Sequence, residues 1–152
     1  DYTAGPKLGK LLDGRYIIAD VVRDQVGPDA RDRLMANTAA NDGTTVRIGI
    51  PQDPGQAGKT QVLDLTRKLA GFMVHSSPET GDKVTRAEPF ASQVNVGNVM
   101  MLRGTWNQAL KDEMRMFPNG KFDDQIDGLS RAFSVLLTAG NPSTAALKVA
   151  GL

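Results

Sequence analysis

The sequence contains no cysteine, one histidine and one tryptophan, and only 5% of its residues are aromatic. The absence of cysteine excludes disulfides, thiolate zinc sites and a cysteine nucleophile. No stretch approaches the roughly 18 consecutive apolar residues of a membrane-spanning helix, and no basic start followed by an apolar run marks a signal peptide. We therefore expect no membrane partner, and the lack of cysteine fits a reducing cytoplasm.

A strong charge of either sign is also absent, because 18 Lys and Arg residues nearly balance 17 Asp and Glu residues. Net charge alone gives no reason to expect a polyanionic partner, so any nucleic-acid site must be a local patch. The length of 152 residues and the hydrophobic content of 40% suit one domain with its own core. We expect that domain at residues 1–140 and a short tail at 141–152.

The order of the hydrophobic patterns favours an α/β fold with a mixed sheet flanked by helices. Two β-rich runs on either side of Asp13-Gly14 predict a hairpin at residues 7–12 and 15–23. Helical and strand-like segments then follow one another along the chain. We predict helices at 30–40, 57–70, 83–94, 106–116 and 123–138, and strands at 45–50, 72–75 and 99–102.

Asp53 follows a predicted strand and opens the segment DPGQAGKT, which ends like a phosphate-binding P-loop. A P-loop requires glycine where Asp53 stands, because the backbone amides must wrap the phosphates and a carboxylate would repel them. Two other interpretations remain open. Asp53 either ligates a metal at the end of the strand, with Pro54 and Gly55 turning the chain, or it caps the following helix.

Three acids, Asp123, Asp124 and Asp127, open the last predicted helix. Residues three apart on a helix point the same way, so Asp124 and Asp127 share a face. The helix dipole and capping explain acids in a first turn, and that account covers Asp123 and Asp124. Asp127 lies beside Ile126 and one turn before Arg131, where either a paired acid or a metal ligand is natural.

Five segments, taken in order, resemble the nuclease domain of the large terminase subunit of tailed bacteriophages. The segments are DYTAG at 1–5, QDPGQAGK at 52–59, GDKVTRAEP at 81–89, GTWN at 104–107 and FPNGKFDDQID at 117–127. Each is weak alone, but five in the same order are specific. The resemblance implies an RNase H-like fold and an endonuclease that hydrolyses phosphodiester bonds of double-stranded DNA.

By this resemblance, clustered carboxylates bind two divalent metal ions, Mg²⁺ or Mn²⁺. The catalytic and metal-binding acids fall on Asp53, Asp127 and Asp124, and Asp1 matches an accessory acid. Members of the family carry a further catalytic acid on a first strand just upstream of the segment that matches Asp1, and we expect that strand to be missing from these residues. Many relatives have histidine where this chain has Phe122, so a histidine role is not transferred.

For DNA binding we expect phosphate contacts from Lys83 and Arg86, one turn apart, and from Lys59 and Lys121 beside the acids. A solvated basic face is the alternative, and for Lys121 it is favoured. The family implies further partners: an upstream ATPase domain of the same polypeptide, the small terminase subunit and the portal. It places the protein in the host bacterial cytoplasm, at the procapsid.

Two other classes compete with the nuclease interpretation. One is a catalytically silent module that binds DNA or docks on the packaging motor, in which the acids only cap helices. The other is a P-loop nucleotide hydrolase. The lone His75 falls on a short strand away from the acids, and we expect it to be structural.

Overall fold

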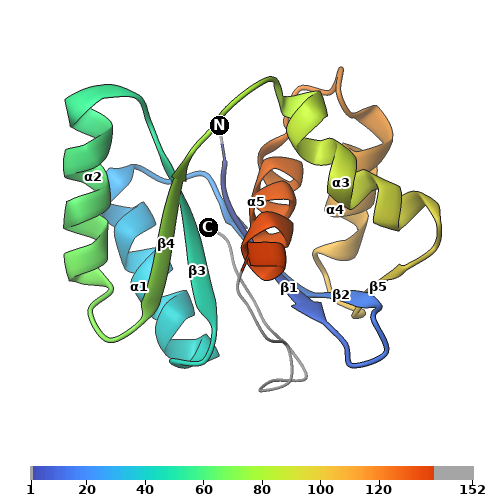
Figure 1. The fold of residues 1–152 in the computed structure, drawn as a ribbon, viewed down its shortest axis with the longest axis horizontal. Coiled ribbons are helices and arrows are strands. Elements are labelled where there is room, and N and C mark those ends of the chain that lie inside the picture. Colours follow the sequence, from blue (N-terminus) through green and yellow to red (C-terminus); the bar gives the residue numbers. More distant parts are fainter. Residues whose placement is uncertain (1, 139–152) are drawn as a thin grey trace.

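The computed structural model describes residues 2–138 as two small sheets separated by one long helix, and the α/β class is confirmed (Figure 1). The predicted hairpin is present as β1 (Thr3–Lys10) and β2 (Tyr16–Asp24), paired antiparallel. Gly14, with a φ of 91°, turns the chain between them. The short β5 (Val99–Met101) pairs parallel to β2, so this three-stranded sheet is mixed.

The second sheet consists of β3 (Arg47–Gln52) and β4 (Met73–Pro78), which run parallel. Our prediction ended the first of these strands before Pro51, but Pro51 lies inside β3 opposite Ser77. Proline is tolerated there because β3 pairs with only one neighbour among residues 2–138, and an edge strand does not use every N–H. The predicted strand at 72–75 is likewise longer and reaches Pro78.

The helices α1 (Pro28–Asp42) and α2 (Gly55–Lys68) cover one face of the β3–β4 sheet (Figure 1). They bury a small apolar cluster against it. The cluster consists of Met35 and Ala39 from α1, Ile48 and Ile50 from β3, and Leu65 and Leu69 at the end of α2. Parallel strands need a crossover connection, usually a helix, and α2 lies between β3 and β4 in the chain.

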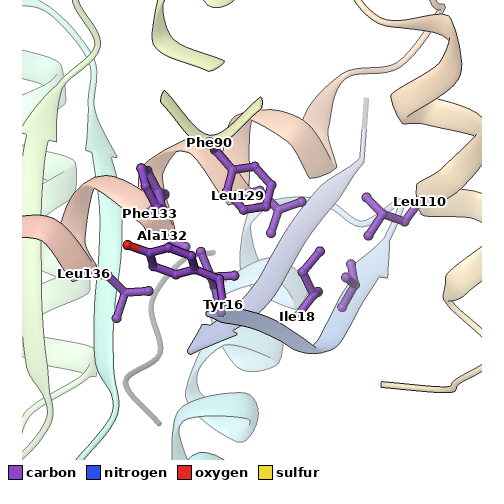
Figure 2. Close-up of a cluster of buried hydrophobic side chains, with 10 residues drawn as sticks. Tyr16, Ile18, Phe90, Leu110, Leu129, Ala132, Phe133 and Leu136 are labelled. Carbon is purple, nitrogen blue, oxygen red and sulfur yellow. The ribbon is translucent and has the colours of Figure 1, made fainter. Parts of the chain in front are cut away.

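The larger core lies between the β1–β2–β5 sheet and the helices α3 (Lys83–Asn95), α4 (Asn107–Met116) and α5 (Asp124–Thr138). Figure 2 shows Phe133 of α5 against Tyr16 of β2 and Phe90 of α3. Leu129 of α5 is fully buried. Helix α3 continues through Pro89 without a break.

Helix α5 contacts both sheets, and two glycines allow the close approach. A Cβ on Gly128 would lie 2.6 Å from Cδ of Pro6 in β1, and one on Gly49 of β3 would lie 2.9 Å from Cγ2 of Val135 in α5. Since such distances are shorter than real carbon contacts, both positions require glycine. At these two positions α5 therefore packs closely on β1 and on β3.

None of the described helices is long and apolar enough to span a membrane.

Candidate active site

A pocket of about 290 Å³ opens between the start of β1, the end of β3 and the first turns of α5. Four acids line it: Asp53, Glu79, Asp124 and Asp127. We call it the acidic pocket. The fold thus brings Asp53 to the same pocket as Asp124 and Asp127, about 70 residues later in the chain. Such a place, at the carboxyl end of a parallel strand, is where α/β folds commonly bind ligands.

Asp53 directly follows β3, and its backbone is held by α2. Helix α2 has Pro54 at its N-cap and receives no hydrogen bond from a capping side chain, so the helix-cap interpretation of Asp53 is wrong. A Cβ on Gly58 would lie 1.8 Å from the carbonyl oxygen of Asp53, so glycine lets the first turn of α2 pack on that residue. The side chain of Asp53 is exposed in the pocket.

The segment 55–60 does not form a P-loop. Helix α2 begins at Gly55, so these residues are already helical and leave no open loop of amides to surround phosphates. Gly55 has a φ of 85°, which sets the turn from Pro54 into the helix. The sequence similarity to a P-loop ending reflects this tight strand-to-helix turn.

The first turn of α5 is capped by Glu113 of α4. Its Oε2 accepts a hydrogen bond from the backbone N–H of Ile126 at 2.9 Å, and its Oε1 accepts one from Nε2 of Gln125 at 3.0 Å. Glu113 and Gln125 are both buried. Because Glu113 satisfies this helix end, Asp124 and Asp127 are left to face the acidic pocket, and Asp124 also accepts a hydrogen bond from the Tyr2 N–H at 3.4 Å.

Asp127 is half-buried, and its carboxyl pKa is raised from 3.8 to about 6, with burial as the largest cause. The negative charges of Asp123 and Glu79 contribute to this rise, while Arg86 and Lys83 oppose it. The balance shows that the carboxylates near Asp127 repel it more than the nearby cations stabilise it. Perturbed acids of this kind concentrate at functional sites.

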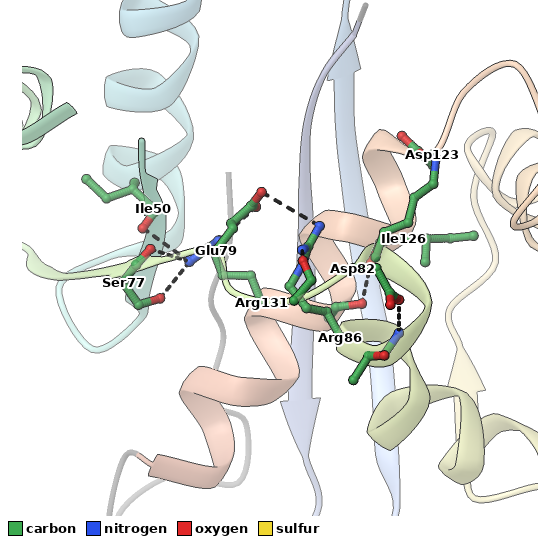
Figure 3. Close-up of polar contacts among 12 residues, drawn as sticks. Ile50, Ser77, Glu79, Asp82, Arg86, Asp123, Ile126 and Arg131 are labelled. Carbon is green, nitrogen blue, oxygen red and sulfur yellow. Dashed lines mark hydrogen bonds and ion pairs between the residues drawn. The ribbon is translucent and has the colours of Figure 1, made fainter. Parts of the chain in front are cut away.

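Lys83 and Arg86, predicted to contact phosphates, are both paired with acids, and Figure 3 shows Arg86 near Glu79. Lys83 Nζ makes a hydrogen-bonded ion pair with Asp123. Arg86 Nη1 donates to the Gly81 carbonyl at 2.7 Å, and Nη2 lies 3.8 Å from Glu79. Both side chains remain partly exposed beside the pocket, so their role in DNA contact stays a prediction.

Glu79 and Arg131 were not proposed as site residues from the sequence, yet both line the acidic pocket and lie side by side (Figure 3). Arg131 Nη2 donates to Glu79 Oε1 at 2.9 Å. Nη1 donates to Ser77 Oγ at 2.7 Å and, at 3.3 and 3.4 Å, to the carbonyls of Ser77 and Ile50. Glu79 directly follows β4, just as Asp53 directly follows β3. An acid after each of two predicted strands was the sequence pattern that could have identified Glu79 as a site residue.

The remaining predicted residues lie as follows. Lys59 is exposed in the first turns of α2 and does not line the acidic pocket. Lys121 is exposed, with Nζ 5.1 Å from the ring centre of Phe122. Asp1, the expected accessory acid, lies outside the described residues. His75 is exposed on β4 and away from the pocket lining.

The donors of the acidic pocket suit a hard divalent cation in type, because they are carboxylate oxygens. Burial and the neighbouring carboxylates disfavour the ionised form of Asp127 and raise its pKa, and a divalent cation beside it would favour that form. Within residues 2–138, however, no three His, Asp or Glu side chains are already grouped closely enough to hold a metal. The acids fit the ion in chemistry and place, and binding would have to draw them together.

In this α/β fold, the acid after β3 and the acids at the start of α5 line one pocket. The family of terminase RNaseH-like domains matches residues 1–136, and the chain belongs to that family. The resemblance found in the sequence is thereby confirmed. No curated protein and no solved structure is detectably similar to the chain.

Proposed function

We propose that this domain is a metal-dependent endonuclease that cuts double-stranded DNA during phage genome packaging. The observation that supports it best is that Asp53, Asp124 and Asp127, from two distant parts of the chain, line one pocket. Membership of the terminase RNaseH-like family supports a nuclease-type activity. We propose Asp53, Asp124 and Asp127, with Asp1 as an accessory acid, as ligands of two Mg²⁺ or Mn²⁺ ions.

Bound divalent cations in such a site supply activation of water and neutralisation of charge on the phosphate and the leaving oxygen. The protein's own residues position the oxygen ligands. Gly58 leaves room for the backbone of Asp53 against α2, and Glu113 caps the turn that carries Asp124 and Asp127. Arg131 then joins α5 to both strands of the β3–β4 sheet.

The proposed partners follow from the same family. We propose that the substrate is double-stranded, concatemeric DNA, contacted through its backbone, because a packaging nuclease cuts varied sequences. An ATPase domain of the same polypeptide, the small terminase subunit and the portal complete the proposed assembly, at the procapsid in the host cytoplasm.

Calorimetric titration with Mn²⁺ and a plasmid-cutting assay with Mg²⁺ or Mn²⁺ test this proposal together. We expect heat of binding that disappears in Asp127→Asn, and nicking or linearisation of the plasmid that EDTA abolishes. Binding of DNA without metal binding or cutting would instead support a silent DNA-binding or motor-docking module. The observation that would favour that second candidate is the lack of a ready-made three-ligand cluster among the described residues.

A further inference from the structure

Two arginines line the acidic pocket, Arg31 of α1 and Arg131 of α5, and their surroundings differ. Arg131 donates to four acceptors: the carbonyls of Ile50 and Ser77, Oγ of Ser77 and Oε1 of Glu79. Its side chain is only 10% exposed. Turning this guanidinium toward a ligand would break these contacts, so Arg131 is committed to holding the fold.

Among residues 2–138, the side chain of Arg31 is held by hydrogen bonds to Asp32 alone. Its Nε and Nη2 donate to the same oxygen of Asp32, Oδ1, each at 3.1 Å. A guanidinium has five N–H groups, so the two used here leave donors on Nη1 and Nη2. The side chain is 29% exposed, nearly three times the value for Arg131.

Asp32 orients the guanidinium of Arg31, but its negative charge is shared with a second cation. Its second oxygen, Oδ2, accepts a hydrogen bond from Nζ of Lys68 at 2.8 Å, so two cations share this carboxylate. Asp32 itself is largely buried, with its side chain 13% exposed, and is held by both partners. Arg31 is thus pre-oriented at the wall of the acidic pocket and keeps unused donors.

The negative charge of the acidic pocket suggests a role for Arg31. Four carboxylates line it, and a DNA strand adds negative phosphates, so a phosphate near these acids needs positive charge beside it. Arginine suits this role because its planar fork donates two parallel hydrogen bonds to phosphate oxygens. We propose that Arg31 binds a backbone phosphate of the DNA strand that enters the acidic pocket; this inference rests on the proposed nuclease function.

Arg31→Ala, Arg31→Lys and the control Arg33→Ala test the inference. Arg33 lies on the same helix, is exposed and does not line the pocket, so its removal changes net charge equally. The binding of a fluorescein-labelled DNA duplex is measured by anisotropy in EDTA at several salt concentrations. We expect Arg31→Ala to weaken binding about tenfold and to lower the salt slope by about 1, with a clearly smaller change for Arg33→Ala.

Arg31→Lys should restore the salt slope but only part of the affinity, because lysine keeps the charge and loses the fork. If Arg31→Ala fails to fold, the affinity and salt slope of Arg31→Lys test the inference instead. Equal binding by the Arg31 and Arg33 variants, or no duplex binding by the unsubstituted protein, overturns the inference. Because EDTA removes metals, this result is separate from cutting: a protein that binds through Arg31 but never cuts refutes the nuclease proposal alone.

Discussion

Arg131 Nη2 and Glu79 Oε1, 2.9 Å apart, join helix α5 to the loop after β4. The same guanidinium reaches the carbonyls of Ile50 in β3 and Ser77 in β4. Since β1 and β3 are not hydrogen-bonded to each other among residues 2–138, α5 is the element that links the two sheets. Arg131 lies one helical turn from Asp127, so this link positions Asp127 of α5 relative to Asp53 and Glu79, which follow β3 and β4.

We predict that Arg131→Met lowers the free energy of unfolding by about 2 kcal/mol, because it removes the donor that lies 2.9 Å from Glu79 and the charged donor shared by two strand carbonyls. The cutting activity of this variant should also fall, because Asp53 and Asp127 are no longer held at a fixed separation. Urea unfolding and a plasmid assay measure the two effects. Arg115→Met, an exposed position on α4, is the control, and equal stability of the two variants would contradict the prediction.

Asp53→Asn and Asp127→Asn should each keep the fold and lower metal-dependent cutting by about 100-fold or more. Each change removes one charged oxygen ligand, and losing about 3 kcal/mol of charge stabilisation corresponds to roughly that factor. Rates of plasmid linearisation under Mg²⁺ and Mn²⁺ provide the measurement. Asp64→Asn, exposed on α2, is the matched control. Full activity in either pocket variant would remove that residue from the site.

The raised pKa of Asp127 predicts a pH-dependent stability. Burial favours the protonated carboxyl, so its stabilising contribution is complete below about pH 4 and is lost as pH rises through about 6. Asp127→Asn cannot ionise and should therefore exceed the unsubstituted protein in metal-free stability by about 1 kcal/mol near pH 8, since solvent screens a half-exposed group. Urea unfolding in EDTA across this range tests it, and a constant difference between the two proteins would contradict it.

Divalent cations compete with the proton on Asp127. We expect Mn²⁺ affinity to rise as pH increases through about 6, with proton release on binding below that pH. Calorimetry in buffers of different ionisation enthalpy measures the released protons. An affinity that is the same on both sides of this pKa would show that Asp127 is not a ligand.

Lys83→Ala combined with Arg86→Ala should weaken DNA binding about equally for different sequences and reduce the salt slope by about 1 to 2, because phosphate contacts carry no sequence information. In the structure both side chains pair with acids, so binding DNA would exchange Asp123 and Glu79 for phosphates. Anisotropy at several salt concentrations provides the slope. The matched control is Lys111→Ala with Arg115→Ala on α4, and an unchanged slope in the first variant would place the DNA elsewhere.

The sequence alone determined the elements and the family. Apolar spacing and turn residues act over a few neighbours, so the hairpin around Gly14 and helices such as α2 and α5 were predicted within a few residues of their observed bounds. Ordered motifs identified the terminase RNase H-like family, which the match over residues 1–136 confirms. The position of Asp53 just after a strand was also readable, because Pro54 and Gly55 mark the turn.

Only the tertiary structure decided which charged groups meet. Whether Asp53 caps a helix depends on a geometry that Pro54 and Gly58 set, and the pairing of Lys83 with Asp123 spans 40 residues. Glu113 caps a helix that begins 11 residues after it, a contact that no local pattern announces. Ion pairs and shared pockets form between side chains that packing brings together. The energy of that packing comes from contacts throughout the core, so no short sequence segment predicts it.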